Sequence, residues 1–177
     1  MNISTPVIFT DGSDFYEALS NEYERHNKGL FILAPSGAGK TFFVKSQTTQ
    51  DWIDGDDLWP AAGADTTSND WSDDGQLVEE TNRRCDVVTN EARKLGFWVI
   101  GSSNDSLRPD AIVLPEWPVH QQYIKSREVK GYDGGAKMKD LDGVLEHREV
   151  IKRWSLKGVP EFRSIIEAVD FFAVQSK

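Results

Sequence analysis

The sequence contains a single cysteine, Cys85, among 177 residues. One thiol cannot form a disulfide within the chain, so we expect a reducing, cytoplasmic location and a packed thiol rather than a nucleophile. Long apolar runs are also missing, and we expect no membrane partner. The first residues lack the basic and apolar stretches of a secretory signal. The length predicts one domain, residues 1–177.

Basic residues are outnumbered by acidic ones, 20 to 29, so the formal net charge is −9. An acidic chain is a poor candidate for coating nucleic acid non-specifically, since phosphate binding needs a basic face. The acidity is uneven. Residues 51–91 hold 12 acidic and 2 basic residues, whereas residues 120–157 hold 6 acidic and 9 basic residues. We therefore expect the cations that approach a bound phosphate to come from a lid at about 120–157.

The most informative stretch begins with an apolar run, Leu30–Leu33, which predicts a buried strand. Ala34–Thr41 follows with the sequence APSGAGKT, a form of the phosphate-binding loop, and a helix is expected at Phe42–Gln47. Strand, loop and helix in this order are the context that supports the motif. Gly37 and Gly39 allow the backbone to curl so that successive N–H groups point toward phosphate oxygens.

Lys40 and Thr41 complete this motif. Lys40 supplies a mobile positive charge to the β- and γ-phosphates, and the Thr41 hydroxyl is placed to bind Mg²⁺. The start of the following helix adds its dipole. Ala34 replaces the first glycine of the strict pattern, at a strand end where ordinary backbone angles suffice. The predicted nucleotide contacts are Ser36, Gly37, Ala38, Gly39, Lys40 and Thr41.

A second stretch places carboxylates at the end of a strand. Trp52 and Ile53 are expected to end that strand, and Asp54 and Asp56 follow. In an open α/β sheet, ligands bind at the carboxyl ends of the strands. Because residues two apart in a strand point the same way, we expect Asp54 to serve the Mg²⁺ shell and Asp56 to act as general base. Alternatively, one of them only holds water on Mg²⁺ and the other caps the next turn.

The rest of the chain predicts alternating helices and strands. The next apolar strand ends in Gly-Ser-Ser-Asn rather than in the aspartate of a Walker B motif, so the Mg²⁺ carboxylate must come from Asp54 or Asp56. His120 and His147 are expected to be surface or lid residues. The other expected elements are strands at 6–9, 97–100 and 111–114, helices at 13–25, 74–95, 120–128 and 139–154, a long loop at 60–74, and a last helix beginning near Pro160.

The phosphate loop and Asp54-Gly55-Asp56 together resemble the small P-loop kinases, such as the adenylylsulfate, gluconate and shikimate kinases and the kinase domain of polynucleotide kinases. The resemblance implies a three-layer α/β fold. In such a fold a mostly parallel, usually five-stranded sheet has the loop strand at its centre, helices on both faces and a helical lid. It also implies ATP and Mg²⁺ as cofactors. By position, the lid arginine of these kinases matches Arg127.

The expected function is ATP-dependent transfer of a phosphoryl group to a hydroxyl acceptor. A hydroxyl is a poor nucleophile and gains from an adjacent carboxylate base, which the acidic pair would supply. A nucleoside, a modified nucleotide, a nucleic-acid hydroxyl and a sugar all fit as acceptors. Two alternatives remain open. One is a nucleoside monophosphate kinase that grips its acceptor with Arg83, Arg84 or Arg108, and the other is a non-catalytic nucleotide-binding regulator.

Overall fold

The computed structural model describes residues 29–48, 51–59, 62, 75–102, 104–132 and 134–175. The strand predicted at 6–9, the helix predicted at 13–25 and nearly all of the loop predicted at 60–74 lie outside these residues. The described residues fall into two compact units. The first unit comprises those within 29–31, 51–99 and 104–107, and the second comprises those within 32–48, 100–102 and 108–175.

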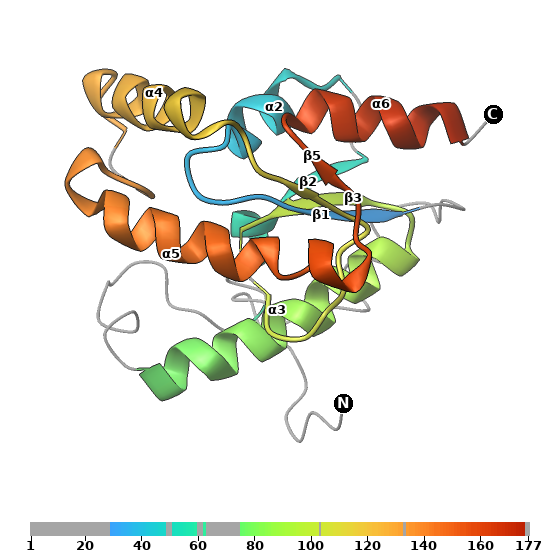
Figure 1. The fold of residues 1–177 in the computed structure, drawn as a ribbon. Helices are drawn as coiled ribbons and strands as arrows, with labels where there is room; N and C mark the ends of the chain where they lie inside the picture. The colour runs from blue at the N-terminus through green and yellow to red at the C-terminus, as the bar shows by residue number, and fades with distance from the viewer. Residues whose placement is uncertain are drawn as a thin grey trace. The chain divides into compact units, whose positions relative to one another are not determined.

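The described strands form a parallel five-stranded sheet in the order β2-β3-β1-β4-β5, with β1 in the centre (Figure 1). Ile32 of β1 lies opposite Ala111 of β4, and Ile112 of β4 lies opposite Glu161 of β5. The predicted α/β class and parallel sheet are confirmed, including the central position of the strand before the loop. The strands are β1 (Leu30–Leu33), β2 (Trp52–Asp54), β3 (Trp98–Gly101), β4 (Ala111–Val113) and β5 (Glu161–Phe162).

In the first unit, the long helix predicted at 74–95 is present as α3 (Gly75–Lys94). Cys85, Val88 and Ala92 recur at helical spacing and are buried. The helix ends where the sequence predicts, because Gly96 takes a φ of 98° that favours glycine. The chain then passes into β3, and Trp98 packs edge-on against Trp52 of β2 at a ring-centroid distance of 4.9 Å.

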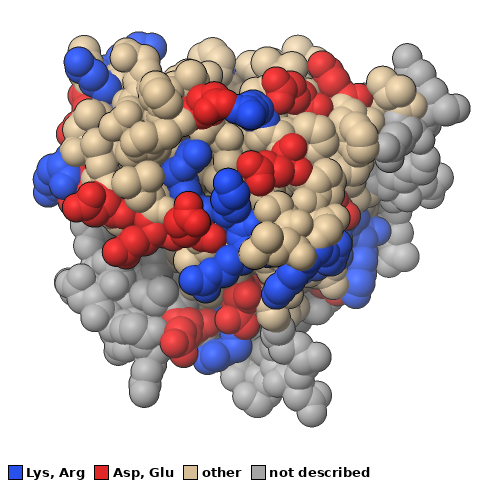
Figure 2. All heavy atoms as spheres, in the orientation of Figure 1, with Lys and Arg blue, Asp and Glu red and all other residues tan. Residues whose placement is uncertain are grey.

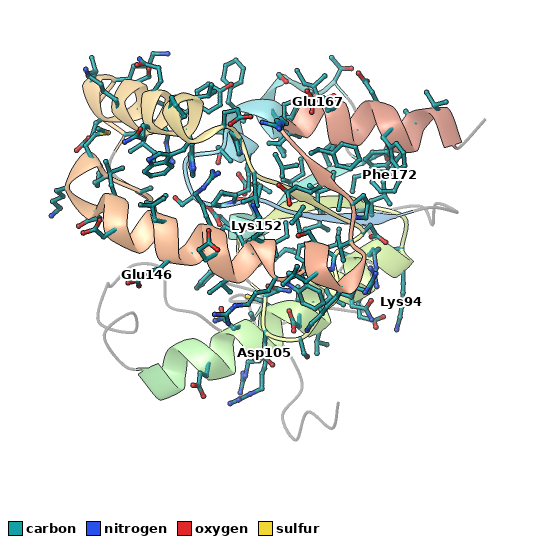
Figure 3. All side chains as sticks on the ribbon, viewed as in Figure 1. Lys94, Asp105, Glu146, Lys152, Glu167 and Phe172 are labelled. Atoms are coloured by element: carbon teal, nitrogen blue, oxygen red, sulfur yellow. The ribbon has the colours of Figure 1, made fainter. Side chains whose placement is uncertain are left out.

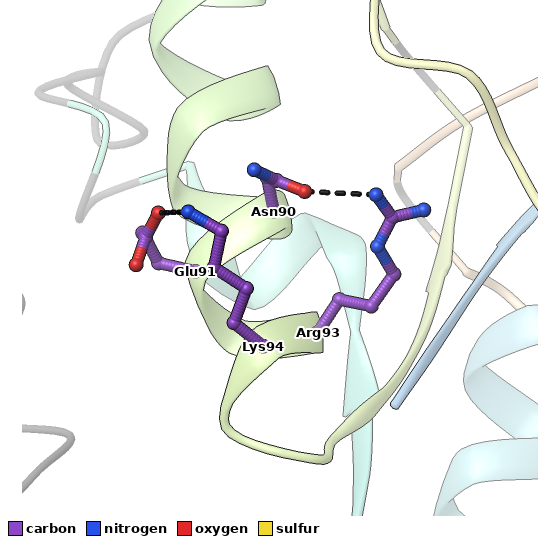
Figure 4. Close-up of polar contacts among 4 residues, drawn as sticks. All are labelled: Asn90, Glu91, Arg93 and Lys94. Carbon is purple, nitrogen blue, oxygen red and sulfur yellow. Dashed lines mark hydrogen bonds and ion pairs between the residues drawn. The ribbon is translucent and has the colours of Figure 1, made fainter. Parts of the chain in front are cut away.

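The last turn of α3 carries two side-chain pairs (Figure 4). Arg93 donates to the side-chain oxygen of Asn90 at 2.8 Å, and Lys94 forms an ion pair with Glu91 at 2.6 Å. Basic residues near a helix C-terminus also interact favourably with the helix dipole. These contacts stabilise the end of the helix that precedes β3.

The second unit contains the predicted phosphate-loop segment from residue 34 to residue 41 and the remaining helices. The helix predicted from His120 begins three residues earlier, at Trp117, because Pro118 in the first turn is favoured there. In Figure 1, α6 and α5 lie on opposite sides of β4 and β5, and α6 packs against both strands. The helices are α2 (Lys40–Ser46), α4 (Trp117–Val129), α5 (Leu141–Lys152) and α6 (Ile165–Gln175), with 3₁₀ turns η3 (Met138–Asp140) and η4 (Ser155–Lys157). No helix in the described part of the chain is long and apolar enough to span a membrane.

The prediction that the last helix begins near Pro160 is wrong. The Pro160 carbonyl accepts a backbone hydrogen bond from Ile112, and the following residues form β5. The helix begins at Ile165, where Ser164 and Glu167 form a capping arrangement. The Ser164 hydroxyl accepts from the Glu167 N–H at 3.2 Å, and the Glu167 carboxylate accepts from the Arg163 N–H at 3.0 Å. Glu167 is labelled at the start of α6 in Figure 3.

Candidate nucleotide-binding site

The segment between β1 and α2 contains two glycines with positive φ. Gly37 and Gly39 have φ values of 84° and 91°, a region that favours glycine. Among the described residues, a Cβ on Gly39 would meet no atom within 4 Å, whereas a Cβ on Gly37 would lie 2.7 Å from Ile124 of α4. The Gly37 side of the loop is therefore packed against α4.

Lys40 opens α2 and is buried, with 6% of its surface exposed. Its ammonium donates to the Pro35 carbonyl of the loop at 3.0 Å. The adjacent Thr41 is exposed. A buried lysine that contacts the loop and an exposed threonine beside it are compatible with the phosphate and metal roles that the motif predicts for these residues.

Ser36 of the loop forms a hydrogen bond with the segment that follows α4. Its hydroxyl accepts a hydrogen bond from the Ala136 N–H at 2.9 Å. Gly135 lies so close that a Cβ there would be 2.7 Å from the Ser36 hydroxyl and 3.1 Å from the Arg127 guanidinium. Arg127 also donates to the Gly134 carbonyl at 3.1 Å. The structure thus brings the predicted lid arginine to the same glycine that contacts the loop.

His120 was predicted to be a surface or lid residue, and the surface assignment is wrong. Its side chain is completely buried. Its Nε2 lies 2.8 Å from the Ser36 carbonyl, and Arg148 of α5 lies 2.9 Å from its Nδ1. Helical spacing could have identified this position, because His120 lies on one stripe with Trp117 and the buried Ile124.

The surroundings of His120 keep its imidazole neutral. Burial lowers the pKa of His120 below its ordinary value of 6.5, and the nearby Arg148, Lys40 and His147 lower this pKa further. The hydrogen bond to Ser36 acts in the opposite direction. A carbonyl only accepts and a guanidinium only donates. His120 is therefore the Nε2–H tautomer, which donates to Ser36 and accepts from Arg148.

Arg148 also lines a hollow of about 250 Å³ in the second unit. Residues after β4 and residues on α5 and β5 line it. Basic and acidic side chains stand side by side on the face that carries α5 (Figure 2), and Arg163 is paired with Glu116. Because the charges largely balance, the hollow has no clear preference for an anion or a cation. Its charged residues are Arg148, Lys152, Arg163, Glu116, Glu149 and Glu161.

Asp54 and Asp56 belong to the first unit, and one premise about them is wrong. The strand β2 ends at Asp54, so Asp56 is not part of it. Gly55–Leu58 forms a 3₁₀ turn, η1, and the buried Asp54 caps this turn by accepting from the Asp56 N–H at 3.1 Å. The side chain of Asp56 is exposed. The roles of the two carboxylates toward Mg²⁺ and the acceptor stay predictions.

Two further residues of the first unit have structural roles. Asp86 of α3 is buried and accepts from the backbone N–H groups of Asp105, Ser106 and Leu107 at 3.1, 2.6 and 2.8 Å. Burial raises the pKa of Cys85 to about 12, and the nearby Asp86 and Asp56 act in the same direction. The thiol therefore stays protonated near neutral pH, which agrees with the predicted packed cysteine.

The arginines proposed for an acceptor phosphate are distributed over both units. Arg83 and Arg84 lie on α3 in the first unit, and Arg108 lies in the second unit. Arg108 donates to the Lys157 carbonyl at 2.9 Å. Within the described residues, no group of three or more potential metal-ligating His, Cys, Asp or Glu side chains is present.

Comparison with protein-family models gives no matching family, and comparison with curated proteins gives no match. The structure itself shows an α/β protein with a parallel sheet and a glycine-rich loop between its central strand and a helix. The resemblance to small P-loop kinases stays a prediction from the sequence motifs.

Proposed function

We propose that this protein is a P-loop kinase that transfers the γ-phosphoryl group of ATP·Mg²⁺ to a hydroxyl acceptor. One observation carries the proposal. The loop after the central strand has two glycines with positive φ, and a buried lysine follows at the first position of the helix. Successive N–H groups in such a turn form a concave site for anions, and the added lysine supplies a charge for the phosphates.

The residues of the second unit divide the work of binding and charge neutralisation. Lys40 exchanges its contact with the Pro35 carbonyl for phosphate oxygens, and the exposed Thr41 offers its hydroxyl to Mg²⁺. Arg127 lies beside Gly135, next to Ser36 of the loop. From there it supports the charge that develops on the transferring group. ATP·Mg²⁺, when bound, supplies the phosphoryl group and a metal that screens its charge.

Two carboxylates of the first unit are assigned to the acceptor side. Asp56 is exposed, which suits a base that must reach a substrate hydroxyl. Asp54 is buried and holds the Asp56 N–H, so it also orients the turn that carries the base. In addition we assign Asp54 to the Mg²⁺ shell, where it orients metal-bound water. The acceptor class remains the nucleosides, nucleotides, nucleic-acid hydroxyls and sugars named above.

The test is ATP consumption by the purified chain against pooled acceptors. Nucleosides, nucleoside monophosphates, oligonucleotides with free 5′-hydroxyls and sugars are screened separately, with Mg²⁺ and with excess chelator. The proposal expects Mg²⁺-dependent turnover with a hydroxyl pool and none with Lys40→Ala. Turnover only with monophosphates would indicate the monophosphate kinase. Nucleotide binding without turnover in any pool would indicate a regulator, and no binding would refute the loop assignment itself.

A further inference from the structure

Ser36 makes two contacts that the motif does not explain. Its hydroxyl accepts from the Ala136 N–H at 2.9 Å, and its carbonyl accepts from His120 Nε2 at 2.8 Å. The donor of the second contact is buried, because the side chain of His120 has no exposed surface. Burying a polar side chain without a hydrogen bond destabilises the folded state. Here both ring nitrogens are satisfied.

The contact with the Ser36 carbonyl also fixes an N–H group. A trans peptide unit is planar, and its C=O and N–H point in opposite directions. Holding the Ser36 carbonyl toward His120 therefore turns the Gly37 N–H away from α4. Gly37 packs against Ile124 of α4 on that same side. The N–H of Gly37 is one of the donors that the motif aims at phosphate.

We propose that neutral His120 is a positioning residue of the phosphate loop, which orients the Ser36–Gly37 peptide for anion binding, and that Arg148 fixes its tautomer. This inference rests on the proposed nucleotide-binding function of the loop. His120 lies on α4 and Arg148 on α5, the two α-helices within the predicted lid at about 120–157. The two side chains thereby link both lid helices to the loop.

Protonation would disturb this arrangement. An imidazolium still donates from Nε2, but its Nδ1 also carries a proton and can no longer accept from Arg148. The added charge would also face Lys40 of the loop and His147 of α5, besides Arg148. Because the pKa of His120 is lower in the folded chain than its ordinary 6.5, the unfolded chain binds more protons between the two values. The free energy of unfolding therefore falls as the pH drops from 6.5 toward the lower pKa of the folded chain, and the Ser36–Gly37 peptide becomes less well ordered.

Nitrogen NMR of the imidazole rings tests the tautomer without any nucleotide. We expect His120 to show a protonated Nε2 and an unprotonated Nδ1 at pH 7.5, and to titrate below the ordinary histidine value. Arg148→Met removes one cation and the donor to Nδ1, so it should raise the pKa of His120. An Nδ1–H tautomer, or a His120 pKa that Arg148→Met leaves unchanged, would overturn the assignment.

Calorimetric titration with ATP·Mg²⁺ tests the positioning role. At pH 7.5, His120→Ala should weaken binding by roughly three- to tenfold, as expected for one lost hydrogen bond. His120→Gln should restore most of the affinity, because its amide can donate to Ser36 and accept from Arg148 without titrating. At pH 5.5, the affinity of wild type relative to His120→Gln should fall. This ratio cancels the protonation of the nucleotide itself.

Gln122→Ala is the matched control. Gln122 is exposed on α4 and its amide contacts Ser126 of the same helix, so this variant should keep the wild-type affinity and pH profile. If His120→Ala is unfolded by circular dichroism, Arg148→Met serves instead and should weaken binding about twofold or more. Wild-type affinity and pH profile in folded His120 and Arg148 variants would overturn the inference alone. A wild-type chain that binds no nucleotide would overturn the proposed function and this inference together.

Discussion

Single glycines serve the loop for two different physical reasons. Gly39 is required for its positive φ, since a Cβ there would meet no atom of the described residues within 4 Å. Gly37 needs both its positive φ and its lack of a side chain, since Ile124 and His120 occupy the adjacent space. The motif predicts the two residues as equivalent. The structure distinguishes them, because only Gly37 packs on α4.

Substitution of Asp56 tests the proposed general base. Asp56→Asn keeps the size of the side chain but removes its basicity. We expect phosphoryl transfer to fall by roughly 10²- to 10⁴-fold while ATP binding is retained. Asp54→Asn should keep the cap of η1, because its amide oxygen can accept from the Asp56 N–H. That variant should raise the Mg²⁺ concentration needed for turnover.

The measurement is the transfer rate of each variant as a function of Mg²⁺ concentration. Asp57→Asn is the control, since Asp57 is an exposed carboxylate of the same 3₁₀ turn. Its rate should stay close to wild type. A wild-type rate for Asp56→Asn with the hydroxyl acceptor would remove the base from the mechanism and favour a monophosphate kinase.

Arg127 is expected to act mainly on the transition state. Its guanidinium approaches Gly135 and donates to the Gly134 carbonyl, so the ground state already holds it near the loop. Arg127→Ala should lower kcat more than it raises the KM for ATP, because the charge matters most when the phosphoryl group transfers. Steady-state kinetics check this. Arg153→Ala, an exposed arginine just after α5, is the control, and equal effects of both variants would contradict the role of Arg127.

At the scale of elements, one buried carboxylate holds the segment after β3. Asp86 of α3 receives three backbone N–H groups from residues 105–107. Asp105 is labelled at this segment in Figure 3. Asn104 closes the same turn by donating to the Leu107 carbonyl at 2.7 Å. The chain is thereby tied to α3 in the first unit before it continues toward β4.

Asp86→Asn should destabilise the protein without changing its catalytic groups. The introduced NH₂ group would face backbone donors, and leaving them unsatisfied costs about 1–3 kcal/mol in the free energy of unfolding. Urea denaturation measures this free energy. Asp105→Asn alters an exposed side chain of the same segment and should change stability by less than about 0.5 kcal/mol. Equal stabilities of the two variants would contradict the clamp.

The sequence predicted those elements that carry their own local signal. The strands β1, β3 and β4 are apolar runs, and α3 ends at a glycine, so their positions agree with the structure to within a residue or two. The strand β5 was missed because it has only two residues and is defined by pairing with β4. The Ser164–Glu167 capping pattern was readable and would have moved the start of α6 beyond Pro160.

The candidate site was predictable only where a contiguous motif encodes it. The loop from Ser36 to Thr41 follows from its spacing of glycine, lysine and threonine. His120 reaches the loop from 84 residues along the chain, and Arg148 in turn contacts His120. No local pattern specifies such contacts. The start of η1 after Asp54 depends on a side chain capping a turn, which alternation along a strand does not reveal.

At the scale of the whole molecule, the sheet order and the charge distribution agree with one account. The strand before the loop is central in the parallel sheet. The chain has a net charge of −9, yet two arginines lie next to residues that contact the loop. Arg148 donates to His120, which contacts Ser36, and Arg127 donates to the Gly134 carbonyl beside Gly135. An acidic protein with cations near one loop suits a small anionic ligand better than extended nucleic-acid binding.

Calorimetric titration of ATP·Mg²⁺ into the wild-type chain and Lys40→Ala tests this account most directly. The wild type should bind, and Lys40→Ala should lose roughly 10- to 150-fold in affinity, as expected for a lost charge-assisted hydrogen bond. Lys45→Ala changes an exposed lysine on the same helix and should bind like wild type. Equal affinities of Lys40→Ala and wild type, or no binding by the wild type, would contradict the assignment of residues 34–41 as a phosphate-binding loop.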